Sequence, residues 1–301
     1  MALTLVALLT QSAFGAENGA PPYAVGSMGY FAVPQAPGLY WLNQTSFANL
    51  SALYGDSGEK LPLAYHSEAI FNTFRILNVW SLNLPGGGLL ASQVTMPVGH
   101  VWSRLGSRAN STSGLGNVTL APAVTIWHLS SELTMLAGVG FVTPSATYNR
   151  NSVANMAVNY WSIQPAIGLH YIGPGLDIGI SPRVALNTQN EATHYQSGNM
   201  VFLDYSVGWH LGDFEPGVVG GLWEQYSNDY QSGRLVNGNG NKSGKVTLGP
   251  SLVYWHGRFA FNINFQHSFA IRNAAGSNAI WFNVAIPLSA SLFGEPARML
   301  Q

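Results

Sequence analysis

The stretch that decides the fold is Phe259-Ala260-Phe261-Asn262-Ile263-Asn264-Phe265-Gln266, in which apolar and polar residues alternate strictly. The chain from Val201 to Leu211 repeats this alternation. A period of two predicts a β-strand with one apolar and one polar face. In a soluble sandwich the apolar face points into the core, whereas in an outer-membrane barrel it points outward to lipid and the polar face lines a lumen.

The composition favours the membrane barrel. Charged residues make up 8% of the 301 residues, whereas a typical soluble domain has about 25%. Mean hydropathy is +0.13, yet no run of about 18 apolar residues follows the N-terminus, which argues against spanning helices. A net charge of −1 argues against a nucleic-acid partner, which requires a basic face. The absence of cysteine suits a chain that passes through an oxidising periplasm.

The N-terminus has the pattern of a secretory signal peptide. Residues 2–9 form a short apolar core, and Ala13-x-Gly15 has small residues where a signal peptidase cuts. We therefore expect residues 1–15 to be removed, with the cut after Gly15 or one residue later, after Ala16. A short buried strand or helix is the alternative interpretation.

Runs of alternation predict an all-β, closed antiparallel transmembrane barrel of about 12 strands, spanning residues 39–288. Each run is long enough for a tilted strand to cross a bilayer. The predicted strands are 39–52, 66–82, 88–100, 116–130, 132–143, 157–172, 175–188, 198–211, 215–228, 243–256, 257–270 and 278–288.

The predicted connections alternate in length, which is typical of outer-membrane barrels. Short turns fall near residues 85–88, 130–131, 173–174, 212–213 and 257. We expect the long polar connections to face outside, at 53–65, 101–115, 144–156, 188–197, 229–242 and 271–277. An even number of strands places both chain ends on the periplasmic, short-turn side.

Two terminal segments flank the predicted barrel. Residues 16–38 are rich in proline and glycine and too irregular for a strand, so we expect them to hang in the periplasm or to fold into the lumen as a partial plug. Irregular backbone at membrane depth is tolerated only inside such a cavity. Residues 289–301 follow the last predicted strand as a C-terminal tail.

Aromatic residues recur where strands run toward the short turns. Interfacial aromatics at one depth form the girdle of a transmembrane barrel. The predicted periplasmic girdle consists of Trp80, Trp127, Tyr171, Trp209 and Trp255.

Four histidines near this girdle could bind a metal ion. His170 and His210 share parity with lumen-facing residues, whereas His128 and His256 share parity with lipid-facing residues. Because the four do not converge, the pattern predicts no metal site. No phosphate-binding glycine loop is present, and no cofactor is expected.

A lipid hydrolase on the barrel wall would need a histidine and a serine oriented by an asparagine on the outer face. His66-Ser67 and His267-Ser268 lie near long connections, but no Gly-x-Ser-x-Gly motif singles out a nucleophile. We therefore predict no catalytic residues and no enzyme activity.

Parity also predicts which polar residues line the lumen. Their few charges are of both signs, whereas charge selection requires rings of like charge. The lumen-lining candidates are Arg75, Tyr160, Gln164, Asp177, Arg183, Asn187, Asp204, Asn262 and Asn264.

Three internal segments carry a family resemblance, and the opening of the chain adds to it. Asn155-x-x-x-Asn159-Tyr160-Trp161-x-x-x-Pro165 resembles an element of the outer-membrane transporters named for the meta-pathway of phenol degradation. The stretch Asn187-x-x-Asn190-x-x-Thr193-x-Tyr195-x-Ser197-Gly198 is similar to the second signature of that family. Gly114-Leu115-Gly116-Asn117 with Trp127-His128, and the opening Glu17-Asn18-Gly19, also match. The family pattern differs at three points, since Asn117 replaces an aspartate, Thr143-Pro144-Ser145 replaces Pro-Thr-Gly, and Phe202 replaces a histidine.

The resemblance implies a barrel in the outer membrane of a Gram-negative bacterium that is linked to the uptake of aromatic compounds. We predict passive uptake of small aromatic or hydrophobic molecules, with membrane lipid and a small solute as partners. The alternatives are a structural or adhesive surface protein and a barrel-embedded lipid hydrolase. The sequence leaves the oligomeric state and the substrate open.

Overall fold

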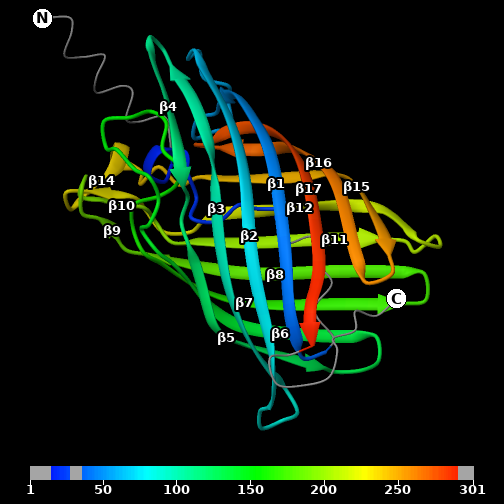
Figure 1. Ribbon diagram of the computed structural model, residues 1–301. Helices are drawn as coiled ribbons and strands as arrows, with labels where there is room; N and C mark the ends of the chain where they lie inside the picture. The colour runs from blue at the N-terminus through cyan, green and yellow to red at the C-terminus, as the bar shows by residue number, and fades with distance from the viewer. Residues whose placement is uncertain (1–14, 28–35, 291–301) are drawn as a thin grey trace, which may run out of the picture.

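The computed structural model describes residues 15–27 and 36–290, and these form a closed antiparallel β-barrel around an N-terminal segment (Figure 1). Two short 3₁₀ turns, η1 (Glu17–Gly19) and η2 (Val236–Gly238), are the helical elements of the described chain. No helix in these ranges is both long enough and apolar enough to cross a membrane. The predicted signal peptide falls almost wholly outside the described residues.

The barrel wall has twelve strands, because β4 and β5 together form one interrupted strand that pairs with β3. Ring closure comes from antiparallel pairing of the first strand, β1, with the last, β17, and of β2 with β3. The wall strands are β1 (Gly38–Leu53), β2 (Tyr65–Asn83), β3 (Leu89–Leu105), β4 (Arg108–Leu115), β5 (Thr119–His128), β6 (Leu133–Val142), β7 (Ser162–Gly173), β8 (Leu176–Asn187), β11 (Met200–Gly208), β12 (Phe214–Gln225), β15 (Gly244–His256), β16 (Phe259–Arg272) and β17 (Ala275–Ala290).

The prediction of twelve strands in a closed antiparallel barrel is confirmed, and two connections differ from it. Residues 101–115 were expected to be a loop, but β3 and β4 continue as a paired ribbon as far as Leu105 and Arg108, with Gly106 in a positive-φ turn. The connection at 271–277 shrinks to Asn273 and Ala274. Two residues of the expected tail, Ser289 and Ala290, belong to β17, and residues 291–301 lie outside the description.

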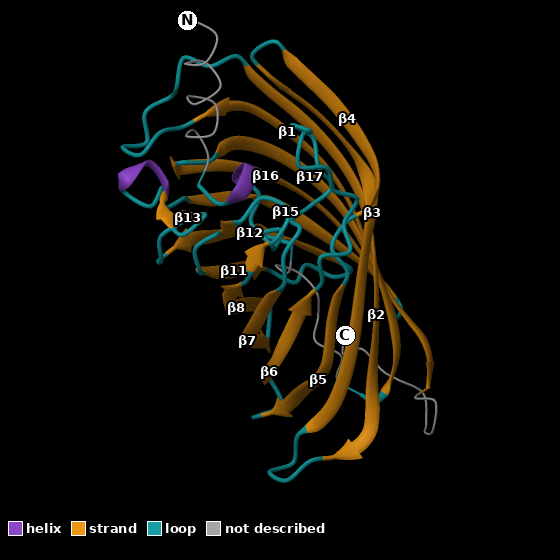
Figure 2. Cartoon of the chain, turned by 90° about the vertical axis from the view of Figure 1, so that its left-hand side faces the viewer, coloured by secondary structure: helices purple, strands orange, loops and turns teal. Residues whose placement is uncertain are grey.

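A small second sheet covers part of the long-connection end. It consists of β9 (Gln189–Asn190), β10 (Tyr195–Gln196), β13 (Tyr230–Gln231) and β14 (Arg234–Leu235), in the order β14-β13-β10-β9. Two of the long connections, 188–197 and 229–242, are therefore ordered by pairing with each other. Figure 2 shows this end of the barrel, with the two short 3₁₀ turns in purple close to the strand ends.

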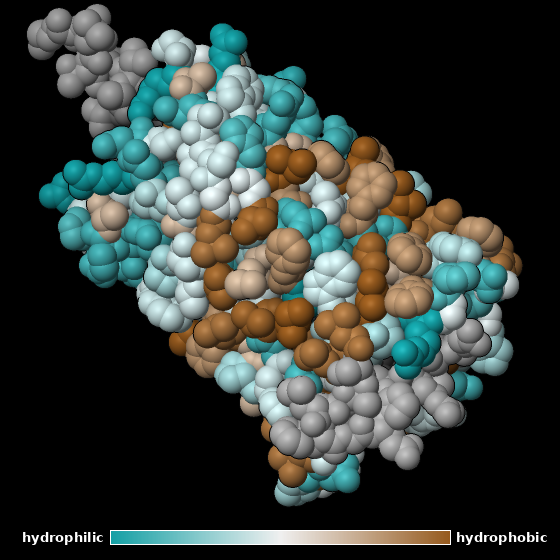
Figure 3. Space-filling model, in the orientation of Figure 1, coloured by the Kyte–Doolittle hydropathy of each residue, from teal (hydrophilic) through white to brown (hydrophobic). Residues whose placement is uncertain are grey.

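The alternation of the sequence corresponds to the two faces of the wall. On β16, Phe261 and Ile263 are 42% and 45% exposed, whereas Asn262 and Asn264 are buried. The large exposed apolar residues gather across the middle of the wall, and hydrophilic residues cover the long-connection end (Figure 3). An outward apolar band on a closed barrel is the arrangement of an outer-membrane protein.

A β-bulge corrects one sequence-based assignment. The β5–β6 register shifts between Leu120 and Val124, so the residues after the bulge exchange faces. His128, which was assigned to the lipid side, instead bonds through Nδ1 to the buried Thr134 Oγ1 at 3.1 Å. A bulge therefore invalidates parity counting on this strand.

Candidate functional site

The described N-terminal segment, residues 15–27, lies inside the barrel and runs from the long-connection end toward its middle. The Asp204 carboxylate on β11 accepts a hydrogen bond from the Tyr23 hydroxyl and another from the Gly26 backbone N–H at 2.7 Å. The Gln266 amide donates to the Gly26 carbonyl at 3.1 Å, and the Gln44 amide donates to the Ser27 carbonyl at 2.6 Å. The segment is thus bonded to strands on different sides of the wall.

Inward polar side chains also bond to one another. Asn264 donates to the Asn262 amide oxygen at 2.8 Å, and Asn283 donates to the same oxygen at 2.7 Å. Arg75 donates to Gln44 at 3.1 Å. These contacts satisfy polar groups that would otherwise be costly to bury. The middle of the barrel therefore carries a hydrogen-bonded polar belt around the segment.

The structure buries eight of the nine predicted lumen residues. Arg75, Tyr160, Gln164, Asp177, Asn187, Asp204, Asn262 and Asn264 are all 7% exposed or less. The ninth, Arg183, is partly buried, bonds to Gln164 and lies 4.3 Å above the Tyr23 ring centroid. Tyr160 precedes β7 in a connection rather than standing on a strand. Whether these residues line a path for solute stays a prediction.

At the long-connection end, Glu17 is the centre of a buried network. Its carboxylate accepts hydrogen bonds from Tyr148 at 3.1 Å, Asn190 at 2.6 Å and Thr193 at 2.6 Å. Its backbone N–H donates to Ser197 Oγ at 3.0 Å. Burial raises the pKa of Tyr148 to about 12, and the neighbouring Glu17 carboxylate adds to the rise.

The three segments that carry the family resemblance meet at this network. Asn159 donates to Asn190 at 2.8 Å, which joins the first motif to the second. Asn117 accepts from the Val158 N–H at 3.1 Å and donates to the Val158 carbonyl at 2.8 Å. Aspartate could not make the second of these bonds, so the asparagine found here is matched to its surroundings. The motifs therefore fix the connections around the N-terminal segment.

A second buried carboxylate, Asp229, was missed by the sequence analysis. It is 0% exposed and accepts from the Ala16 N–H at 2.9 Å and the Gly198 N–H at 2.6 Å. The Tyr195 hydroxyl and the Gln225 amide also donate to it, each at 2.7 Å. Burial raises the pKa of Asp229, whereas its hydrogen bonds lower it. No sequence motif marks this residue, because its four partners come from three separate segments of the chain.

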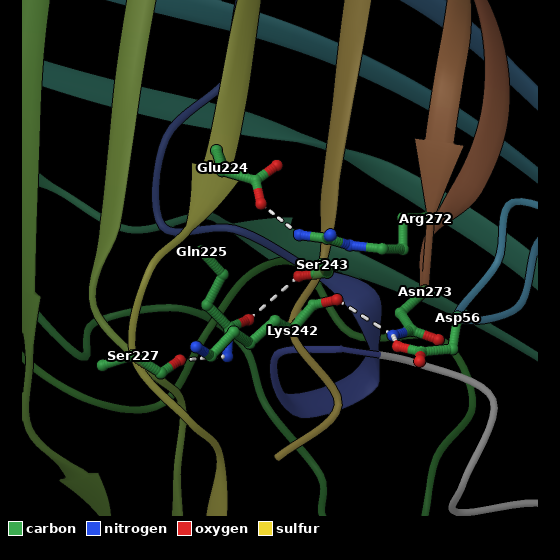
Figure 4. A network of polar contacts seen from close by, with 8 residues as sticks. All are labelled: Asp56, Glu224, Gln225, Ser227, Lys242, Ser243, Arg272 and Asn273. Atoms are coloured by element: carbon green, nitrogen blue, oxygen red, sulfur yellow. Dashed lines mark hydrogen bonds and ion pairs between the residues drawn. The ribbon is translucent and has the colours of Figure 1, made fainter. Parts of the chain in front are cut away.

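A polar collar surrounds the start of the segment (Figure 4). Gln225 accepts from Ser243 Oγ at 3.0 Å and donates to the Ser227 carbonyl at 2.9 Å. The Asn273 amide donates to the Lys242 carbonyl and to Asp56, each at 2.9 Å. An ion pair between Arg272 and Glu224 lies at the rim of the collar.

The interior also contains two apolar clusters that parity alone did not single out. Toward the long connections, Tyr23 packs edge-on against Phe202 with ring centroids 5.3 Å apart, and Phe202 stacks on Trp223 at 6.4 Å. Toward the short turns, inward residues from seven strands form a second cluster, called here the inner apolar cluster: Tyr40, Leu42, Leu77, Val79, Ala91, Ile126, Val253, Ala260 and Ala285. The lumen is therefore not uniformly polar.

A vestibule of about 410 Å³ opens between the N-terminal segment and strands β1 to β3. Its lining mixes apolar residues such as Leu50 and Val101 with polar ones such as Ser67. Arg108, Arg150 and Lys245 also line it, together with the bonded Glu17. The vestibule thus has room for a small molecule and an excess of basic residues.

Two of the four histidines join buried acids at the short-turn end. His170 Nε2 lies 2.8 Å from Asp177 Oδ1, and His210 Nδ1 lies 3.4 Å from Glu215 Oε2. Ligand atoms of Asp177, His210 and Glu215 lie within 4.8 Å of one another. Parity placed these two histidines and Asp177 on the inner face, but it did not single out Glu215 beside His210.

Trp255 departs from the predicted girdle. Its indole N–H donates to the buried Glu215 at 3.0 Å, and its ring packs against the inner apolar cluster. Trp80, Trp127, Tyr171 and Trp209 remain candidates for the girdle, and Trp209 is 49% exposed. Trp255 and Val253 share the inward parity of β15, whereas the girdle as a whole stays a prediction.

Neither His–Ser pair that the sequence offers, His66-Ser67 or His267-Ser268, has its side chains together as a nucleophile and base. Ser67 is buried and bonds to Ser103 Oγ at 2.8 Å, whereas His66 bonds to Glu68 at 3.0 Å. On β16, His267 bonds to Asn278 at 2.7 Å, but Ser268 is buried on the opposite face. Adjacent residues on a strand point to opposite faces, which separates each histidine from its serine.

The barrel resembles solved outer-membrane proteins in fold. A channel from the outer membrane of Pseudomonas putida F1 superimposes with a TM-score of 0.75 at 14% identity, over 85% of this chain and 97% of that one. The translocator domain of the autotransporter NalP from Neisseria meningitidis gives a TM-score of 0.50 at 11% identity, over 85% and 90% of the two chains. At these identities the likeness concerns the fold. No curated protein matches the sequence.

Residues 51–284 match the protein family described as the MetA-pathway of phenol degradation. This match includes ten of the twelve wall strands completely and part of β17, together with the three motifs that carry the resemblance. The chain therefore belongs to the phenol-degradation MetA-pathway family of outer-membrane β-barrels.

Proposed function

We propose that this barrel is a passive channel for small aromatic or hydrophobic molecules, and that residues 15–27 narrow its path. The observation that carries the proposal is that aromatic and apolar side chains lie on both sides of the polar belt. Aromatic rings of Tyr23, Phe202 and Trp223 lie beyond the polar belt on one side, and the inner apolar cluster lies on the other. Such surfaces accept the flat apolar face of an aromatic solute, while the belt can bond its polar substituent.

The charged side chains of the polar belt do not form a ring of one sign. Arg75 and Arg183 share the interior with Asp204, and Asp177 lies closer to the short turns. Rings of like charge are what select ions in channels. We therefore expect weak ion selectivity and a preference for neutral aromatics over sugar acids.

Aromatic acids are a second candidate substrate class, because Arg108, Arg150 and Lys245 line the vestibule. Their positive charge would attract a carboxylate at the entrance, while the rings deeper inside would accept the aromatic body. The two candidate classes share the aromatic moiety and differ in charge.

Planar-bilayer recording separates these candidates. The purified barrel should conduct, show a small reversal potential in a salt gradient, and be blocked transiently by 4-hydroxybenzyl alcohol but not by glucuronate. Block by benzoate with a strong anion preference would support the aromatic-acid candidate. A barrel that stays silent even without residues 16–27 would contradict a channel and favour the structural or adhesive alternative.

A further inference from the structure

The peptide bond between Gly15 and Ala16 lies in a constrained and buried place. Ala16 has φ 54° and ψ 157°, a left-handed φ that alanine rarely adopts and that costs free energy. A Cβ added to Gly15 would lie 2.3 Å from the Asn241 carbonyl oxygen and 2.4 Å from Ser243 Cβ. The uncut chain therefore passes through the collar only with strain at Ala16 and a glycine before it.

This bond is also the one that the signal-peptide pattern marks for cleavage. Hydrolysis adds the hydroxyl of water to the Gly15 carbonyl carbon and a proton to the Ala16 nitrogen. That nitrogen takes up one further proton at neutral pH and becomes an ammonium group. An N-terminal residue has no φ constraint, so the cut removes the strain at Ala16.

The nitrogen that would become charged already faces a buried acid. Ala16 is 1% exposed and Asp229 is 0% exposed, and their contact is 2.9 Å. The other donors to Asp229 are the neutral groups of Gly198, Tyr195 and Gln225. Within residues 15–27 and 36–290, no lysine, arginine or histidine forms an ion pair with Asp229. A buried carboxylate is stable when a positive group pairs with it.

We propose that Asp229 is the binding site for the α-ammonium group of the processed chain, so that signal-peptide removal creates the charge that anchors the N-terminal segment in the barrel. Glu17, one residue later, supports this geometry through its bonds to Ser197 and Asn190. An ammonium group adds a charge–charge attraction to Asp229 that the neutral Ala16 N–H lacks, so the processed segment is held more firmly than the precursor. The proposal concerns the anchor and stands whether or not the barrel conducts.

Mass spectrometry and amine labelling test the site directly on barrel purified from outer membranes. The intact mass should correspond to a chain that begins at Ala16. A dilute succinimidyl ester at pH 7 should then label the Ala16 amine about tenfold more slowly in the wild type than in Asp229→Asn, because pairing with a carboxylate raises the amine pKa and reduces its reactive neutral form. The matched control is Asp213→Asn, an exposed carboxylate at the opposite end, which should leave the labelling rate unchanged.

A second variant keeps the test valid if Asp229→Asn fails to fold. Insertion of Ser-Gly before Ala16 leaves Asp229 intact but moves the ammonium two residues away, and that amine should react as fast as an exposed one. The proposal is overturned if the mature chain begins elsewhere, if the Ala16 amine labels equally fast in the wild type and Asp229→Asn, or if the inserted amine is as protected as the native one.

Discussion

Arginine placed at two depths on the outer face of β16 tests the position of the membrane. Ile263 and Phe269 point outward and are 45% and 44% exposed, so the two positions are matched in strand, face and accessibility. Six residues separate them, which at about 3.3 Å per residue is about 20 Å along the strand. A tilt of about 40° reduces this to about 15 Å along the membrane normal.

That distance determines the free-energy cost expected for an arginine at each position. Ile263 pairs with Leu252 and Phe282 in the middle of the apolar band, whereas Phe269 lies beside the long-connection end. An outward arginine costs about 2–4 kcal/mol at the midplane of a bilayer and about 0–1 kcal/mol near its surface. Ile263→Arg should therefore lower the free energy of unfolding by about 2 kcal/mol more than Phe269→Arg.

The assay is urea-induced unfolding of the barrel in thin phosphatidylcholine vesicles, followed by tryptophan fluorescence. The denaturant midpoint should fall clearly for Ile263→Arg and little for Phe269→Arg, with unchanged slope. Equal losses at the two positions would refute the depth assignment. Equal and small losses would show that this face does not contact lipid at all.

Three further predictions follow from the contacts of the N-terminal segment and the connections. Deleting residues 16–27 should raise single-channel conductance, because it removes Tyr23 and the other groups bonded to the middle belt; unchanged conductance would mean that the segment does not narrow the path. An epitope inserted between Gly106 and Ser107, at the tip of the β3–β4 ribbon, should bind antibody on intact cells, and one at Gly87 should not; labelling of Gly87 would reverse the topology. Raising the pH from 10 to about 12 should weaken the Glu17 network, because a raised pKa for Tyr148 means that the folded form disfavours its ionisation. Phenolate absorbance that appears in step with release of the segment would support this, and ionisation of Tyr148 without release would count against it.

The strands were predictable because alternation is a local signal that needs no knowledge of distant residues. The adjacent residues Phe261, which is exposed, and Asn262, which is buried, already distinguish the two faces of β16. The β3–β4 ribbon was missed because it carries Arg104, Arg108 and Asn110 with little apolar contrast between its faces. Where both faces need polar residues, periodicity carries no information.

The interior was only partly predictable, for a different physical reason. Parity found Asp204 and Asn262 but not Asp229, whose partner Ala16 lies 213 positions away in the sequence. It also missed Val253 and Trp255, because β15 is apolar on both faces near its end. Contacts between an irregular segment and a wall depend on tertiary geometry that no short pattern encodes.

The direction of the N-terminal segment constrains how the molecule can be assembled. Its first described residues lie at the long-connection end, whereas the strand that follows it, β1, begins at the opposite end. That same strand forms the seam with β17, so the last pairing to close the cylinder involves the strand joined to the segment. Contacts such as Tyr23 with Asp204 join residues 181 positions apart, and loop-closure entropy opposes them until the intervening strands are paired. The order of assembly is therefore restricted. A growing sheet can wrap around the N-terminal segment before β1 pairs with β17. After that pairing the segment can enter or leave the barrel only along its axis, so its release is limited by threading rather than by opening of the wall.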